Sequence, residues 1–151
     1  FAAEEWEFAG GKSLFDRARQ EARESRIDGR PDILGSDIDA RSIDLCKKHA
    51  KKAGVMVNWK VAPLKELSTD KSGGLIVCNP PYGERMMEKR EAEALYREMR
   101  HKFDELDNWQ VSVITAYRDF ERIYGKRADK RRKLSNGGMV CTMYQYFKRN
   151  D

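Results

Sequence analysis

The stretch Leu75–Arg85, LIVCNPPYGER, runs from hydrophobic residues into an amide, two prolines, a phenol and a glycine. Its apolar start predicts a buried strand over Gly74–Cys78. Each proline fixes its φ angle and lacks an N–H, and the residue before a proline is held extended. The turn is therefore stiff, and it presents the carbonyls of Asn79 and Pro80 and the Asn79 amide oxygen as hydrogen-bond acceptors. A planar amino group fits such acceptors, and Tyr82 offers an aromatic face for a flat ring.

The segments around this strand predict an α/β order. Asp39 and Gly54 are suited to begin and end a helix, and Ser-Asn-Gly-Gly is a hairpin signal. In chain order we predict a helix over 12–26, a strand in DILGSDID (32–39), a helix between Asp39 and Gly54, a strand over Val55–Ala62, a loop over Pro63–Gly73, the strand Gly74–Cys78, a helix over Met87–Leu106, a strand in WQVSVITAY (109–117) and a hairpin in RRKLSNGGMVCTMYQYF (131–147).

This order indicates a mostly parallel sheet with helices on both faces and a closing antiparallel hairpin. In such sheets, ligands bind at the carboxyl ends of the strands. Two polar segments stand there, Gly35–Asp39 and Asn79–Arg85. The four residues of the turn are also common in purely structural turns, so the turn alone leaves that role open.

Composition sets the broad class. A chain of 151 residues is enough for one domain, and no apolar run is long enough for a membrane span. Three cysteines do not form a disulfide framework, which favours a reducing, cytoplasmic setting. Cys46 and His49 lie three residues apart, but no second pair completes a metal site, so we predict no metal. No sequence feature indicates an oligomeric state.

Basic residues gather near the end of the chain, whose net charge is +5. The segment Arg118–Lys133 holds 8 Lys or Arg against 3 acidic residues. Two interpretations stay open: a solvated surface, or a patch that contacts phosphates.

Asn-Pro-Pro-Tyr after a hydrophobic strand resembles the motif of class I S-adenosylmethionine-dependent amino-methyltransferases. The longer string GLIVCNPPYGER (74–85) is similar to the RNA guanine-N2 methyltransferases that carry a THUMP domain and are often labelled N6-adenine-specific DNA methylases. The other strings that carry the resemblance are FAAEEW (1–6), GSDIDARSIDLCKKHAKKAGV (35–55), LYREM (95–99) and RADKRRKLSNGGMVCTMYQY (127–146).

The resemblance implies a Rossmann-like class I methyltransferase fold with S-adenosyl-L-methionine as cofactor. It places Asp37 on the cofactor's ribose hydroxyls and Ile38 beside the adenine ring. Glu66 would meet the adenine amino group, where Asp is more typical of the family. Asn79 would also contact the cofactor, and the catalytic residues would be Asn79, Pro80, Pro81 and Tyr82.

The resemblance also implies an RNA substrate. It gives Arg85 and the basic segment weight as RNA contacts, and Glu84 with Arg85 is equally well interpreted as a structural ion pair. The candidate nucleic-acid contacts are Arg85, Lys126, Arg127, Lys130 and Arg131.

The implied activity is methyl transfer to an exocyclic amino group of a nucleobase, with guanine N2 in ribosomal RNA as the first candidate. DNA adenine N6, a protein glutamine, or a non-catalytic nucleic-acid-binding role remain alternatives. By resemblance, residues 1–151 are part of a catalytic domain, and the first strand, its glycine-rich loop and the THUMP module lie outside this chain. We therefore expect activity in a longer polypeptide and little in the isolated piece.

Overall fold

The computed structural model describes residues 1–27, 29, 32–83, 86–136 and 138–147. Its elements are the 3₁₀ turns η1 (Ala2–Glu5), η2 (Glu7–Ala9) and η3 (Leu64–Glu66), the helices α1 (Gly11–Glu24), α2 (Ala40–Ala53), α3 (Met86–Asp104) and α4 (Phe120–Tyr124), and the strands β1 (Leu34–Asp37), β2 (Asn58–Val61), β3 (Gly74–Cys78), β4 (Trp109–Thr115), β5 (Lys130–Asn136) and β6 (Met139–Tyr146). The predicted order of strands and helices is confirmed, and β3 has the predicted bounds.

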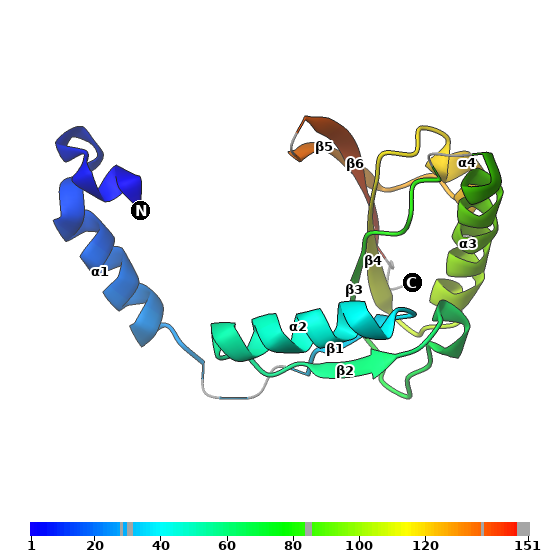
Figure 1. Cartoon of the computed structure of the whole chain (residues 1–151), viewed down its shortest axis with the longest axis horizontal. Coiled ribbons are helices and arrows are strands. Elements are labelled where there is room, and N and C mark those ends of the chain that lie inside the picture. Colours follow the sequence, from blue (N-terminus) through cyan, green and yellow to red (C-terminus); the bar gives the residue numbers. More distant parts are fainter. Residues whose placement is uncertain (28, 30–31, 84–85, 137, 148–151) are drawn as a thin grey trace.

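The strands form two sheets (Figure 1). In the smaller sheet, β1 and β2 run parallel. The larger sheet has the order β3-β4-β6-β5, with β3 and β4 parallel and β6 antiparallel to both of its neighbours. This is the predicted parallel core with a closing hairpin, divided into two sheets that the sequence did not predict.

The strand predicted over Val55–Ala62 is shorter in the structure, because its first residue, Val55, belongs to the C-terminal cap of α2. Gly54 has a φ of 66° and its N–H donates to the Lys51 carbonyl at 3.2 Å. The N–H of Val55 donates to the Ala50 carbonyl at 3.0 Å, which completes a Schellman cap. β2 therefore starts at Asn58.

A glycine faces a tryptophan in each parallel strand pair. Gly35 pairs with Trp59 and Gly74 with Trp109. A Cβ added to Gly35 would lie 2.2 Å from the Trp59 ring, and one added to Gly74 would lie 2.6 Å from the Trp109 ring. These glycines are needed because the indole rings lie directly over their backbone, and both have ordinary φ angles.

The main core lies between α3, α4 and the larger sheet. Tyr96, Met99 and Phe103 project from α3, and Phe120 and Tyr124 from α4. The helix α4 within Arg118–Lys133 was not predicted. Its apolar residues are buried in this core, whereas the Lys and Arg residues of the segment are exposed, which fits both interpretations of the segment. With only 5 residues, α4 is too short for a helical spacing of its apolar residues to be recognised in this basic segment.

The first segment lies apart from the sheets in Figure 1. Its turns η1 and η2 contact α1, and Arg19 of α1 pairs with Glu4. None of the α1 residues is buried. No helix in the described part of the chain combines the length and apolar character that crossing a bilayer requires.

Candidate active site

The Asn-Pro-Pro-Tyr turn leaves the carboxyl end of β3 and closes on itself. The Tyr82 hydroxyl donates to Oδ1 of Asn79 at 2.7 Å. The same hydroxyl lies 3.7 Å from Sγ of Cys141 on β6. The Tyr82 hydroxyl is therefore contacted both from within the turn and from β6, while Asn79 stays exposed and Pro80 is buried.

A second tyrosine holds the turn from behind. The hydroxyl of Tyr96, which is 0% exposed, donates to the Pro81 carbonyl at 2.6 Å. Its oxygen also lies 3.5 Å from Oγ1 of Thr115 at the end of β4. Tyr96, Thr115 and Cys141 could not be predicted as site residues, because nothing in their local sequence patterns distinguishes them from ordinary core residues.

Gly83 lets the turn pass close to α3. Its φ is +65°, and an added Cβ would lie 2.7 Å from Cα of Lys89 and 3.0 Å from the Glu88 carbonyl oxygen. Both the backbone conformation and the backbone contact therefore require glycine.

Asp37 ends β1 with one carboxylate oxygen already bonded. Its Oδ1 accepts from the Asp39 N–H at 2.8 Å. The next residue, Ile38, is 75% exposed. Asp39 caps α2 as predicted, accepting from the Arg41 N–H at 2.9 Å. The remaining oxygen of Asp37 and the Ile38 side chain are available to a ligand at this edge.

Glu66 lies in η3, just after β2 ends beside Asp37. Leu64 and Leu67 flank it and pack against the core under α3. The Glu66 carboxylate lies 3.5 Å from Nζ of Lys60. This loop connects the carboxyl end of the smaller sheet with the core of the larger sheet. A second link between the two sheets is the ion pair of Lys71 with Asp32, near the amino ends of β3 and β1.

The phenols of Tyr82 and Tyr96 and the thiol of Cys78 have raised pKa values, so all three are protonated at neutral pH. Burial, followed by the Cys141 thiol, raises the pKa of Tyr82, against a lowering by its bond to Asn79. Burial also raises the pKa of Tyr96, and it raises that of Cys78 to about 12. Both phenols therefore remain hydrogen-bond donors.

Two of the candidate RNA-contacting residues, Lys126 and Lys130, lie away from the turn. The Lys126 carbonyl accepts from Tyr146, whose partner on β4 is Val111 near the amino end of that strand. Leu134 on β5 pairs with Cys141, the residue that contacts Tyr82, and so marks the level of the turn. Lys130 lies four residues before Leu134, which corresponds to about 13 Å along a strand.

Arg131 has a carboxylate partner of its own, with Nε donating to Glu121 at 3.0 Å. Arg127 is exposed, and Arg85 lies outside the described residues. Within the basic segment, Lys133 lies at the level of the turn. It pairs with Thr142 on β6, and Thr142 pairs in turn with Thr115 at the end of β4.

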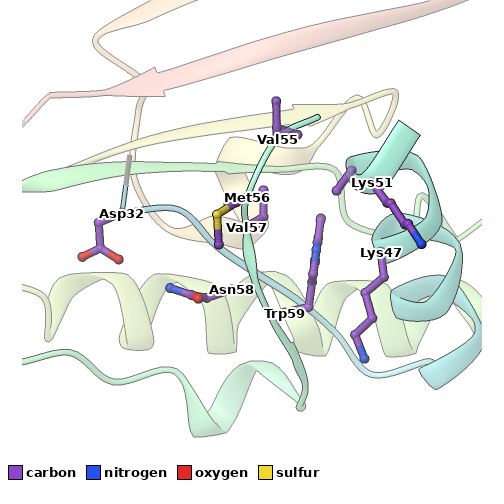
Figure 2. A pocket seen from close by; sticks show the side chains of 9 residues that line it. Asp32, Lys47, Lys51, Val55, Met56, Val57, Asn58 and Trp59 are labelled. Carbon is purple, nitrogen blue, oxygen red and sulfur yellow. The ribbon is translucent and has the colours of Figure 1, made fainter. Parts of the chain in front are cut away.

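A hollow of about 600 Å³ lies elsewhere, between α2 and the segment that enters β2. Figure 2 shows Lys47 and Lys51 on one side of it and Asp32 on the other, with Trp59 between. None of the predicted catalytic or cofactor-binding residues lines it. In the described part of the chain, no three His, Cys, Asp or Glu side chains form a group that could hold a metal ion.

The fold is that of a class I, Rossmann-like methyltransferase. The sequence matches the family described as UPF0020, RMKL-like methyltransferase domain, over residues 2–145. The chain belongs to this family.

Relatives of the chain are named as methyltransferases. It is 40% identical to the Bacillus subtilis protein named "Putative RNA methyltransferase YpsC", over 99% of this chain and 39% of that protein. It is 32% identical to the ribosomal RNA large subunit methyltransferase K/L of Legionella pneumophila strain Corby, over 87% of this chain and 19% of that protein.

A solved structure agrees. SMU.472, titled "a putative methyltransferase complexed with SAH", superposes with a TM-score of 0.81 at 36% identity, over 92% of this chain and 38% of that one. The chain thus spans about two fifths of the length of YpsC and of SMU.472.

Proposed function

We propose that this chain is the catalytic part of an S-adenosylmethionine-dependent enzyme that methylates an exocyclic amino group of RNA, with guanine N2 in ribosomal RNA as the target. The observation that carries the proposal is the stiff acceptor turn at the end of β3, with Tyr82 tied to Asn79. The names of the relatives support an RNA substrate, and the resemblance of GLIVCNPPYGER supports the guanine amine.

The hydrogen bonds of the turn indicate which acceptors serve the amine. The Pro81 carbonyl already accepts from Tyr96. The Asn79 amide oxygen has two lone pairs, of which Tyr82 uses one. We therefore assign the amine's N–H groups to the Asn79 amide oxygen and the Pro80 carbonyl. Holding the amine in this way turns its lone pair toward the methyl group, and such positioning supplies much of the rate.

Tyr82 supports the ring that carries the amine. Tyr82 is partly exposed, and we propose that one face of its ring stacks against the base. A base inside a helix cannot reach the turn, and the target nucleotide must leave its stack first. We propose phosphate contacts from Lys133 in addition to Arg85, Lys126, Arg127, Lys130 and Arg131.

The residues at the end of β1 fit S-adenosyl-L-methionine. A ribose diol donates two hydrogen bonds, and Asp37 has an exposed carboxylate with one oxygen free of the Asp39 N–H. Ile38 offers an exposed apolar face for the adenine, and Glu66 an acceptor for the adenine amino group. The bound cofactor supplies an electrophilic methyl group on a sulfonium.

We further propose that residues 1–151 are the C-terminal part of the catalytic domain, and that a strand, a glycine-rich loop and a THUMP module belong to the same polypeptide. Among the described strands, β1 pairs with β2 alone and β3 with β4 alone, so each has an edge that can accept another strand. Leu75 and Val77 on β3 are 60% and 58% exposed, which a further layer of structure would cover.

The full-length protein tests the proposal. It is incubated with labelled S-adenosylmethionine and either ribosomal RNA from a strain lacking the gene or genomic DNA, with Asn79→Ala as the control. Label recovered from RNA as N2-methylguanine supports the proposal. Label in DNA as N6-methyladenine, or on protein glutamine, overturns the substrate, and the absence of both transfer and cofactor binding overturns the enzymatic assignment.

A further inference from the structure

The buried hydroxyl of Tyr96 reaches the turn from α3, outside the four residues of the motif. We infer that Tyr96 is a positioning residue that sets the orientation of the Pro81–Tyr82 peptide, an inference that rests on the proposed methyl transfer. The contact is direct, since the Tyr96 hydroxyl donates to the Pro81 carbonyl at 2.6 Å.

A fixed carbonyl fixes the peptide plane. A trans peptide is planar, so the N–H of Tyr82 points opposite to the Pro81 carbonyl, away from Tyr96. Holding that plane sets the direction in which the Tyr82 side chain leaves the backbone. The ring is then held at its far end, where the hydroxyl meets Asn79 at 2.7 Å and Cys141 at 3.7 Å. The stacking face is therefore fixed from both ends.

Tyr96 has little freedom to move. Its ring packs edge-on against Tyr117 and Phe120, with centroids 5.4 and 5.0 Å apart. Thr115 is 3.5 Å from its hydroxyl, and Thr115 Oγ1 in turn accepts from the Tyr117 N–H at 3.0 Å. Burial raises the pKa of Tyr96, so its hydroxyl stays protonated and donates.

The bond also removes a competing acceptor. Three consecutive carbonyls, those of Asn79, Pro80 and Pro81, leave the same stiff turn. With the Pro81 carbonyl bonded to Tyr96, an incoming amine meets fewer acceptors and adopts one orientation. Without that bond, the Pro81 carbonyl is free to compete for the amine.

Tyr96→Phe in the full-length protein tests the inference, and Tyr146→Phe is its matched control. Tyr146 is also buried, at 4% exposure, and its hydroxyl also donates to a backbone carbonyl, that of Lys126, at 3.2 Å. Tyr146 pairs with Val111, toward the opposite end of β4 from the turn. Both variants lose one buried phenol bond, but only Tyr96→Phe releases the turn.

We expect hydrogen exchange at the Tyr82 and Gly83 amides to be about tenfold faster in Tyr96→Phe and unchanged in Tyr146→Phe. We expect kcat for RNA methylation to fall about 10- to 100-fold in Tyr96→Phe alone, because a misplaced base reacts slowly. Its affinity for S-adenosylhomocysteine should stay within about twofold, since binding of that ligand does not use the bond.

Equal effects of the two variants, or none from either, overturn the inference in favour of a purely structural role. If the unaltered protein transfers no methyl group to RNA, the proposed function fails. The exchange rates of the two variants then still decide whether Tyr96 positions the turn.

Discussion

At the residue scale, one amide oxygen links the structural and the proposed chemical roles of the turn. Oδ1 of Asn79 accepts one hydrogen bond from Tyr82 and has a second lone pair for another donor. Asn79 is exposed, so its side chain contributes little to packing. Tyr82 is partly buried and contacts Cys141 on β6. Substitutions at the two residues should therefore agree in their effects on activity.

Asn79→Ala and Tyr82→Ala should each lower methyl transfer by at least about 100-fold, because each removes a group that holds the amine or its ring. The melting temperature of the full-length protein should change by only a few degrees. Tyr82→Phe is the control: it keeps the stacking face and loses only the bond to Asn79, so it should retain more activity than Tyr82→Ala. Labelled methyl transfer and thermal unfolding measure the two effects, and a collapse of stability with either alanine would favour the structural-turn interpretation.

Asp37→Asn should weaken cofactor binding about tenfold while leaving RNA binding unchanged, because it replaces one of two acceptor oxygens and keeps the other for the Asp39 N–H. Isothermal titration with S-adenosylhomocysteine gives the affinity.

Asp39→Ala is the comparison for this change. It removes the side-chain cap on the Arg41 N–H and should cost about 1 kcal/mol of stability with cofactor affinity retained. Unchanged affinity in Asp37→Asn would contradict the ribose assignment.

At the element scale, the position of the turn depends on the contact between Gly83 and the backbone of α3. Gly83 passes so near the start of α3 that its Cα faces helix backbone rather than side chains. Backbone cannot rotate away as a side chain can. Gly83 is thus restricted by its contact with α3, in addition to the prolines that precede it.

Gly83→Ala should destabilise the domain by more than the cost of a left-handed alanine, which is about 1–2 kcal/mol. Gly125→Ala measures that cost alone, since Gly125 has a φ of +81° and nothing within 4 Å of an added Cβ. Denaturant unfolding of both variants gives the difference, which we attribute to the contact with Lys89. Equal losses of stability would mean that α3 moves aside freely.

At the scale of the whole molecule, stability rests on a core rich in phenols. Burial raises the pKa of Tyr124 and of Tyr117 to about 12, from an ordinary value of 10.0. A raised pKa in the folded state means that the unfolded chain loses its proton first. The stabilisation from these groups is therefore complete below pH 10 and is lost as the pH rises toward 12.

The unfolding midpoint in urea should accordingly fall between pH 10 and pH 12. Tyr124→Phe should make this fall shallower, because one phenol with a raised pKa no longer titrates. Midpoints measured across that range for the unaltered protein and the variant test the expectation, and parallel curves would show that Tyr124 does not contribute.

The sequence by itself determined most of the local elements and predicted the chemistry of the turn. Asp39 and Gly54 mark the ends of α2 because capping depends on adjacent backbone groups, and the prolines after β3 restrict the chain by their own ring geometry. The motif also pointed to an amine and a flat ring, since the residue types alone define those acceptors and that aromatic face.

Only the tertiary structure decided which distant groups meet the turn. Tyr96, Thr115 and Cys141 come from three other elements, and no local pattern encodes a contact 15 to 59 residues away. Strand register likewise placed Lys130 and Arg131 away from the site and Lys133 level with it. The physical reason is that caps and prolines act on neighbouring atoms, whereas register and burial depend on how the whole chain packs.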